Sequence, residues 1–315
     1  MGIVGVDIDR AASIIANGGV VAFPTETVYG LGANALNPNA VAKVFALKER
    51  PSFDPLIVHI ASVDSIGLLT PSTDSRIFRL AERFWPGPLT IVVPKSNIVP
   101  GIVTSDLETV GIRMPNHPIA LELIKKSGCV IAAPSANKFG RVSPTRAEHV
   151  LKQLPDVNYI LDGGKTTVGI ESTVVTLDNE GFIILRHGAI THNHLAQVVN
   201  PSSAHLAQKG LASPGLLKSH YSPNKPLYIA GETSKSIDPS RAGYIAFGKK
   251  PEGNYKLVEY LSETGDMVEA AAHLFEKIHA FEDSDVDYIL IDPVPETGIG
   301  IAIMDRLRKA AYRYR

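Results

Sequence analysis

The chain has 315 residues, 44% of them hydrophobic and 20% charged, and a formal net charge of −1. This composition is typical of a globular protein, and the length predicts two domains. The charge argues against a protein that holds nucleic acid through an overall basic field, although a local basic pocket stays open.

Targeting signals are missing from the sequence pattern. No uninterrupted apolar run reaches the length of a membrane span, and the first residues lack the basic-then-apolar pattern of a signal peptide. We therefore expect no membrane association and a cytoplasmic protein. Cys129 is the only cysteine, so no intrachain disulfide can form, and its apolar neighbours predict a core position.

The first elements end in a polar turn. A helix over residues 8–17 precedes a short β-prone run, 20–23, which stops at Pro24. The polar residues 25–27 follow, and then Gly30 and Gly32, which let the backbone approach another group closely. An α/β protein usually places its ligand where a strand ends in such a turn. A tight turn without a ligand is the alternative.

The next helix carries a lysine on its apolar face. Asn37 or Asn39 is a suitable N-terminal cap, and Pro51 ends the helix. The apolar stripe at Val41, Val44 and Phe45 continues at i+7 to Lys48. Such a lysine either extends its ammonium out to water or meets an anion in the interior.

The middle of the chain alternates strands and helices. Strands are predicted at residues 55–60, 89–93, 109–115, 130–133, 159–161, 172–177 and 182–185. Helices are predicted at 77–84 and 118–126, and after Thr145 and Glu148, which fit a capping box. The run 130–133 ends, like the first strand, at a proline followed by small polar residues. The two polar turns are chemically alike.

A second, smaller unit follows. Residues 189–224 are irregular and predict a linker after a first domain of residues 1–188. Residues 225–315 then show strands at 227–230, 244–247 and 288–291, and helices at 265–281 and 299–313. The first of these helices is expected to turn Val268, Ala271, Phe275 and Ile278 inward. The pattern predicts a small α/β unit with a parallel sheet, serving as a cover or a docking module.

Several familiar motifs are only partly matched. Gly30-Leu31-Gly32 lies too far from its strand for a dinucleotide fingerprint, and no helix follows Gly164-Lys165-Thr166 as a phosphate loop requires. The three histidines of residues 187–194 have no cysteine or paired carboxylate nearby, which favours a solvated loop over a metal site. Glu26 and Glu171 each fit either a general base or a carboxylate bonded to backbone amides.

Cations and hydroxyls recur at the ends of the predicted elements. The cations are Lys48, Arg50, Arg113, Lys138, Arg141 and Arg186. Together with neighbouring hydroxyl groups, they are the groups that a polyphosphate or a carboxylate needs.

The same residues resemble a known family. Lys48-Glu49-Arg50-Pro51 and Ser135-Ala136-Asn137 are similar to the paired K-x-R and S-x-N signature of the YrdC-like family, and residues 23–31, 85–90 and 169–175 match it too. The linker from Ser213 to Pro223 and the last domain resemble the family's long form. The resemblance implies an open twisted α/β sheet with a basic concave face, followed by a smaller Rossmann-like α/β domain.

The resemblance also implies a reaction. L-threonine, bicarbonate or CO2, and ATP give threonylcarbamoyl-AMP and pyrophosphate. A downstream tRNA threonylcarbamoyl transferase complex then modifies the adenosine next to the anticodon. By analogy, ATP and its Mg2+ are held by Lys48, Arg50, Ser52, Thr109, Ser135, Asn137, Ser143, Arg186 and Tyr221. Threonine is held by Thr25, His59, Arg113, Ala133, Ser172 and Thr173. No protein side chain is assigned to the metal, which ATP carries, and no residue is assigned as catalytic.

The sequence departs from the family pattern at two places. Asp54 stands where the family often has Asn, His or Lys, and the linker lacks an arginine before His220 and Tyr221. The main competing hypothesis is a module that binds double-stranded RNA or tRNA on the same basic face, which the near-neutral charge disfavours. Direct, stable binding of tRNA stays open. A carbamoyl-phosphate-dependent transferase is excluded, because its zinc-finger cysteines are missing.

Overall fold

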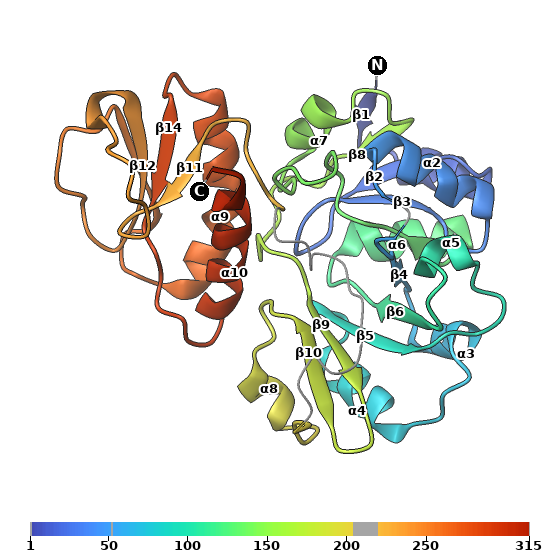
Figure 1. Ribbon diagram of the computed structural model, residues 1–315. Helices are drawn as coiled ribbons and strands as arrows, with labels where there is room; N and C mark the ends of the chain where they lie inside the picture. The colour runs from blue at the N-terminus through green and yellow to red at the C-terminus, as the bar shows by residue number, and fades with distance from the viewer. Residues whose placement is uncertain (1, 52, 204–219, 315) are drawn as a thin grey trace.

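The computed structural model describes residues 2–51, 53–203 and 220–314. Their strands form two separate sheets, which lie side by side in Figure 1. We call the larger sheet with its helices the N-terminal unit and the smaller one the C-terminal unit. Within these residues, none of the helices combines the length and apolarity needed to cross a bilayer.

The N-terminal unit is built on a mixed sheet of ten strands, in the order β1-β8-β2-β3-β7-β4-β6-β5-β9-β10. Its strands are β1 (Ile3–Gly5), β2 (Val21–Phe23), β3 (Gly30–Asn34), β4 (Ile57–His59), β5 (Leu89–Pro94), β6 (Thr109–Arg113), β7 (Ile131–Ala132), β8 (Tyr159–Leu161), β9 (Thr173–Leu177) and β10 (Phe182–Arg186). Its helices are α1 (Ile8–Ala16), α2 (Pro38–Lys48), α3 (Ile66–Leu69), α4 (Ser75–Phe84), α5 (Gly101–Thr104), α6 (Pro118–Ser127), α7 (Ala147–Gln153) and α8 (His192–Ala196).

Apolar cores lie on both faces of this sheet. Helices α1 and α6 pack together against one face with residues of β2, β7 and β8. The other face carries the larger core, to which α2, α4 and α7 contribute. Helix α2 begins as expected, because the Asn37 side chain accepts hydrogen bonds from the amides of Asn39 and Ala40. It ends at Glu49 in a left-handed conformation, before Pro51 is reached.

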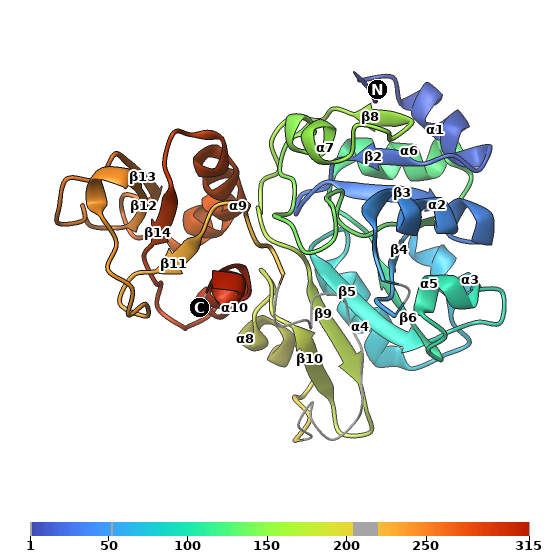
Figure 2. The same cartoon turned by 45° about the horizontal axis from the view of Figure 1, so that its top comes forward.

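The C-terminal unit has a parallel four-stranded sheet, as predicted, in the order β11-β14-β12-β13. Its elements are β11 (Leu227–Ile229), β12 (Ala242–Phe247), β13 (Leu257–Ser262), α9 (Met267–Asp283), β14 (Tyr288–Ile291) and α10 (Gly300–Ala311). Both views show α9 and α10 on the side of this sheet that faces the N-terminal unit (Figures 1 and 2).

Four local predictions were wrong. Gly30 and Gly32 lie in β3 and not in a turn, although the close approach expected of them is confirmed at Gly32, where Phe23 and Ile131 take the space of a side chain. The capping box does not form, because Thr145 pairs with His149 instead. Val268 is 66% exposed at the first turn of α9, and Cys129 is only partly buried. Strand β13 was not predicted.

Candidate active site

Both polar turns border one small cavity. The turn after β2 and the turn after β7 meet through a bridge between Gly30 and Ser135. The cavity is lined by Thr25, Thr27, Val28, Gly30, Arg50, Pro55, Ile57, His59, Arg113, Ala133, Pro134, Ser135, Glu171, Arg186, His220 and Tyr221. Eight of the predicted site residues are among them: Thr25, Arg50, His59, Arg113, Ala133, Ser135, Arg186 and Tyr221.

The cavity volume is about 50 Å³. An apolar cavity of roughly 150 Å³ is known to hold one benzene molecule, so this space is too small for a nucleotide and an amino acid together. Because the cavity is partly open, such ligands would extend beyond it or move its walls apart.

Lys48 connects the K-x-R and S-x-N segments. Its side chain is 1% exposed, and its ammonium donates hydrogen bonds to the carbonyl oxygens of Ser135, at 2.6 Å, and Asn137. Burial, followed by the charge of Arg50, holds the pKa of Lys48 well below its usual range. The lysine thus neither reaches water nor meets a carboxylate: it fixes the backbone of the turn that presents Ser135 to the cavity.

Arg50 is held at the cavity wall by its own segment. Its guanidinium donates to the carbonyl oxygens of Asp54, at 3.0 Å, and Pro55, at 3.1 Å. It also pairs with the Asp54 carboxylate at 2.8 Å. Asp54 is buried, and burial raises its pKa against the opposing effect of Arg50. The acid at this unusual position therefore faces the arginine and not solvent.

Arg113 ends β6 beside the first polar turn. Its Nη2 donates to Thr27 Oγ1 at 2.9 Å, and the Glu26 carboxylate lies 2.9 Å away in an ion pair without hydrogen-bond geometry. Arg113 Nε has no hydrogen-bond partner among the described residues, although it is buried. A guanidinium with an unused donor suits a carboxylate ligand. The Thr25 hydroxyl closes the same turn by donating to the carbonyl of Val28 at 2.7 Å.

His59 is the neighbour of Arg113 across β4 and β6. Burial, and then the charge of Arg113, lowers the pKa of His59 to about 3, so the imidazole is neutral at physiological pH. Its Nδ1 is buried without a hydrogen-bond partner in the described part of the chain. A neutral imidazole with an unused nitrogen can bind a polar ligand group.

Arg186 is positioned by Ser172. The guanidinium donates to the Ser172 carbonyl and hydroxyl oxygens, both at 3.0 Å. Ser172 also contacts Thr90 at 2.8 Å, and the Thr173 hydroxyl donates to the carbonyl of Ile190 at 2.7 Å. Ser172 and Thr173 therefore lie outside the cavity lining and support the arginine and the chain behind it.

The remaining predicted residues lie away from the lining. Asn137 donates from its side chain to the carbonyls of Lys138 and Arg141, which shapes the second polar turn. Ser143 donates to Glu171 Oε1 at 2.6 Å. Thr109 begins β6, at the opposite end of that strand from Arg113. Ser52 lies outside the described residues, as does most of the linker that precedes His220.

His220 and Tyr221 form the lid side of the cavity. Tyr221 is 1% exposed and adopts a left-handed conformation, φ 62°, which is uncommon for a residue with a side chain. Its ring packs against Phe275 of α9 at 5.2 Å. Burial lowers the pKa of His220 to about 3, and its ring meets Phe139 edge-on at 6.0 Å. The backbone of Ser222 donates to the carbonyl of Gly140. This short segment therefore joins the two units at the cavity.

Metal ligands do not gather here. Among residues 2–51, 53–203 and 220–314, no three His, Cys, Asp or Glu side chains are arranged to hold a metal ion. His192 packs against Phe182, and His194 completes the cap of α8.

The sequence prediction missed Arg306 of α10. This arginine is fully buried and lies 3.2 Å from Glu171, a wall residue. The signal was present, because Arg306 falls on the apolar stripe of its helix, as Lys48 does in α2. Thr27, the partner of Arg113, was named only as part of a polar turn.

A twisted mixed sheet that gathers arginines and hydroxyls around one small cavity defines an α/β protein suited to an anionic ligand. The family model for Sua5, YciO and YrdC, described as telomere recombination, matches residues 13–188. A model described as the C-terminal domain of threonylcarbamoyl-AMP synthase matches residues 190–312. The chain belongs to the Sua5/YciO/YrdC family.

Similarity to individual relatives extends over nearly the whole chain. The chain is 42% identical to the threonylcarbamoyl-AMP synthase of Bacillus subtilis, over 96% of this chain and 92% of that one. Identity to the synthase of Pyrococcus abyssi is also 42%, over 96% and 93%. A crystal structure of P. abyssi Sua5 complexed with L-threonine matches with a TM-score of 0.88 and 38% identity, covering 99% and 98% of the two chains. The chain is an enzyme of this family, with the additional C-terminal domain.

Proposed function

We propose that this enzyme makes L-threonylcarbamoyladenylate from L-threonine, bicarbonate or CO2, and ATP, and releases pyrophosphate. The observation that carries the proposal is the convergence of Arg50, Arg113 and Arg186 on one cavity next to Thr25 and Ser135. A triphosphate and an amino-acid carboxylate are both anions, and separate guanidinium groups suit both. The names of the relatives contain the product, threonylcarbamoyl-AMP, and the complex of P. abyssi Sua5 with L-threonine supports threonine as the amino-acid substrate.

The residues divide into two groups in this proposal. Arg113, with its unused Nε, would take the threonine carboxylate, while Thr25, His59 and the backbone of Ala133 surround the rest of the amino acid. Arg50, Arg186, Ser135 and Tyr221 would face ATP. Lys48, Asn137, Ser143, Ser172 and Thr173 hold these groups in place through the contacts described above. Ser52 and Thr109 stay assigned to ATP by the family resemblance alone.

The reaction requires stabilisation of negative charge and exclusion of water from the site. The threonine nitrogen attacks the carbon of CO2 and loses a proton to give a carbamate. A carbamate oxygen then attacks the α-phosphorus of ATP, and the bond to the β-phosphate oxygen breaks to release pyrophosphate. Fixed cations favour such a transfer, and Mg2+ entering with ATP would add to their charge. Carbamate and adenylate both hydrolyse readily, so a cavity closed by Tyr221 protects them.

The product would pass to a tRNA threonylcarbamoyl transferase complex in the cytoplasm, where ATP and tRNA are available. The first experiment incubates the purified chain with ATP, Mg2+, L-threonine and bicarbonate in CO2-depleted buffer and omits each in turn. We expect pyrophosphate and the adenylate only in the complete mixture. Pyrophosphate release that needs neither threonine nor bicarbonate would contradict the proposal.

A second experiment tests closure. Tyr221→Ala removes a wall of the cavity and the contact with Phe275. We expect the KM for ATP to rise about tenfold, the effect of losing roughly 1.4 kcal/mol of binding. Tyr312→Ala is the control, since this tyrosine is 44% exposed. If turnover and ATP affinity of Tyr221→Ala match those of the unmodified chain, the closure mechanism is wrong.

A further inference from the structure

Helix α10 carries a charge into the interior of the molecule. The side chain of Arg306 has 0% exposure and shares the buried face of the helix with Ala302, Ile303, Leu307 and Ala310. A buried guanidinium is costly unless anions and carbonyls surround it. The buried position of Arg306 therefore implies that anionic or carbonyl partners surround its guanidinium.

Its principal partners belong to the N-terminal unit. Arg306 Nε donates to Glu171 Oε2 at 3.2 Å, and Nη1 donates to the carbonyl of His187 at 2.5 Å. The guanidinium carbon lies 5.8 Å from the centre of the Tyr221 ring, within the range of a cation–π contact. A second contact of Nη1, with Asp305 at 3.2 Å, stays on the same helix.

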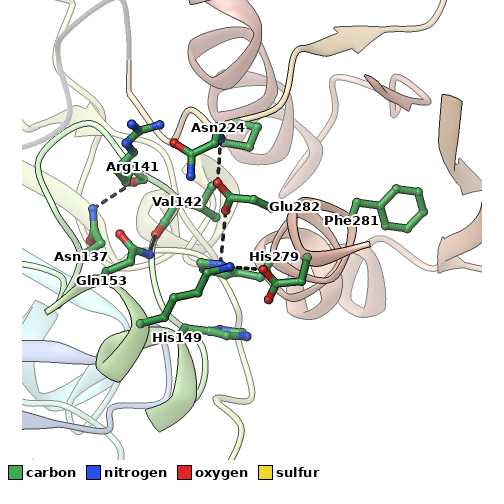
Figure 3. A network of polar contacts seen from close by, with 12 residues as sticks. Asn137, Arg141, Val142, His149, Gln153, Asn224, His279, Phe281 and Glu282 are labelled. Atoms are coloured by element: carbon green, nitrogen blue, oxygen red, sulfur yellow. Dashed lines mark hydrogen bonds and ion pairs between the residues drawn. The ribbon is translucent and has the colours of Figure 1, made fainter. Parts of the chain in front are cut away.

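Glu171 links Arg306 to Ser143 through hydrogen bonds. While Arg306 occupies one carboxylate oxygen of Glu171, the other accepts the Ser143 hydroxyl at 2.6 Å. The carbonyl of Ser143 faces His279 Nε2 of α9 at 3.1 Å. Figure 3 shows His279 where it stacks on His149 of α7, at the boundary between the units. Both long helices of the C-terminal unit thus contact the Ser143–Glu171 pair.

We propose that Arg306 is a positioning residue of the active site: its charge keeps Glu171 an anion that fixes the Ser143 hydroxyl and, with the Tyr221 ring, shapes the ATP side of the cavity. The inference rests on the proposed function, in which Tyr221 faces ATP and Ser143 holds the ATP-facing groups in place. It gives the C-terminal unit a specific task, which is to supply a positive charge to Glu171 in addition to that of Arg186.

The electrostatics of Glu171 support this role. Burial by itself would raise the pKa of the Glu171 carboxyl, but the charges of Arg306 and Arg186 outweigh it and keep the pKa below its ordinary value. Loss of Arg306 removes the largest effect that opposes burial, which shifts the carboxyl toward its protonated form. A protonated carboxyl no longer offers two anionic acceptors, so the Ser143 hydroxyl loses its fixed direction.

The experiment compares Arg306→Met and Arg306→Lys with Glu171→Gln and with the double variant Arg306→Met/Glu171→Gln. Arg308→Met is the control, because Arg308 lies on the same helix, is 40% exposed and pairs with Glu296. For each variant we measure the KM for ATP, the KM for threonine, the Tm, and the Kd for α,β-methylene-ATP by calorimetry. The last readout is independent of turnover.

We expect Arg306→Met to raise the KM for ATP and the analogue Kd about tenfold or more, as for loss of a charged hydrogen bond. The KM for threonine should change less than about threefold, the size of a weak contact. Arg306→Lys should recover most of the loss. Adding Arg306→Met to Glu171→Gln should cost little more, since the neutral amide needs no cation.

Several results would overturn the inference. One is an unchanged ATP affinity in Arg306→Met. Another is a rise of equal size in the KM for ATP and the KM for threonine, together with a lower Tm. Should Arg306→Met fail to fold, an unchanged ATP affinity in Glu171→Gln decides against it. An unmodified chain that binds the nucleotide analogue but releases no pyrophosphate contradicts the proposed reaction instead, and the analogue Kd still tests Arg306.

Discussion

Lys48→Met tests whether this lysine acts on the protein backbone or on the ligand directly. The ammonium donates to two backbone carbonyls, the part-buried one of Ser135 and the buried one of Asn137. Hydrogen bonds from a charged donor contribute about 1.5–3 kcal/mol each, so the pair accounts for about 3–6 kcal/mol. Methionine keeps the buried stem and removes the cost of burying a charge, which offsets part of this. We expect the free energy of unfolding to fall by about 3 kcal/mol.

The assay is thermal unfolding followed by ATP kinetics. For a domain of 150–250 residues, about 3 kcal/mol lowers the Tm by roughly 6–12 °C. Lys43→Met is the matched control on the same helix, because that exposed lysine donates to the single carbonyl of Gly18; we expect it to cost under about 1 kcal/mol. A Lys48→Met protein with an unchanged Tm and a lost affinity for ATP would refute the reasoning and make Lys48 a direct ligand contact.

Two further predictions concern buried charges. Asp54→Asn removes the anion that pairs with Arg50 at 2.8 Å. We expect the KM for ATP to fall about fivefold, because roughly 1 kcal/mol of repulsion between the carboxylate and the ATP phosphates is lost. The Tm should also fall, because Arg50 loses its buried partner. A raised KM would refute it. Burial and the neighbouring His149 lower the pKa of His279 to about 3. The unfolded chain therefore binds a proton at this residue more readily than the folded chain, so the contribution of His279 to stability is complete above pH 6.5 and is lost as the pH falls. His279→Gln keeps a donor for Ser143, and its free energy of unfolding should decline less between pH 7 and pH 5, by about 1.4 kcal/mol per pH unit below pH 6.5. Equal declines in the two proteins would contradict the linkage.

Local patterns predicted the elements that depend on neighbouring residues. The spacing of Val41, Val44 and Phe45 indicated both α2 and the inward direction of Lys48, because helical period is a property of consecutive residues. The same holds for the buried stripe of α4. Strand β3 was missed because its Gly-Leu-Gly-Ala-Asn sequence lacks β-branched and aromatic residues, and only pairing with β2 and β7 stabilises it as a strand.

Contacts between segments that are far apart in the sequence could not be predicted from such local patterns. Thr145 has the sequence of a helix cap, yet it pairs with His149 at the boundary with α9. Arg306 shows the same signal as Lys48, a cation on an apolar face. Which anion it meets depends on how the C-terminal unit packs against Glu171, 135 residues earlier in the chain.

By itself, the sequence of this protein determined its two α/β units, its family resemblance and the cations that end its strands, since those follow from local periodicity and short motifs. Only the tertiary structure decided that Lys48 serves backbone carbonyls, that Asp54 faces Arg50, and that α10 supplies a charge to the cavity wall. The physical reason is that a buried charge takes its partner from whatever group the packing brings within a few ångströms, and packing joins residues that no local pattern connects.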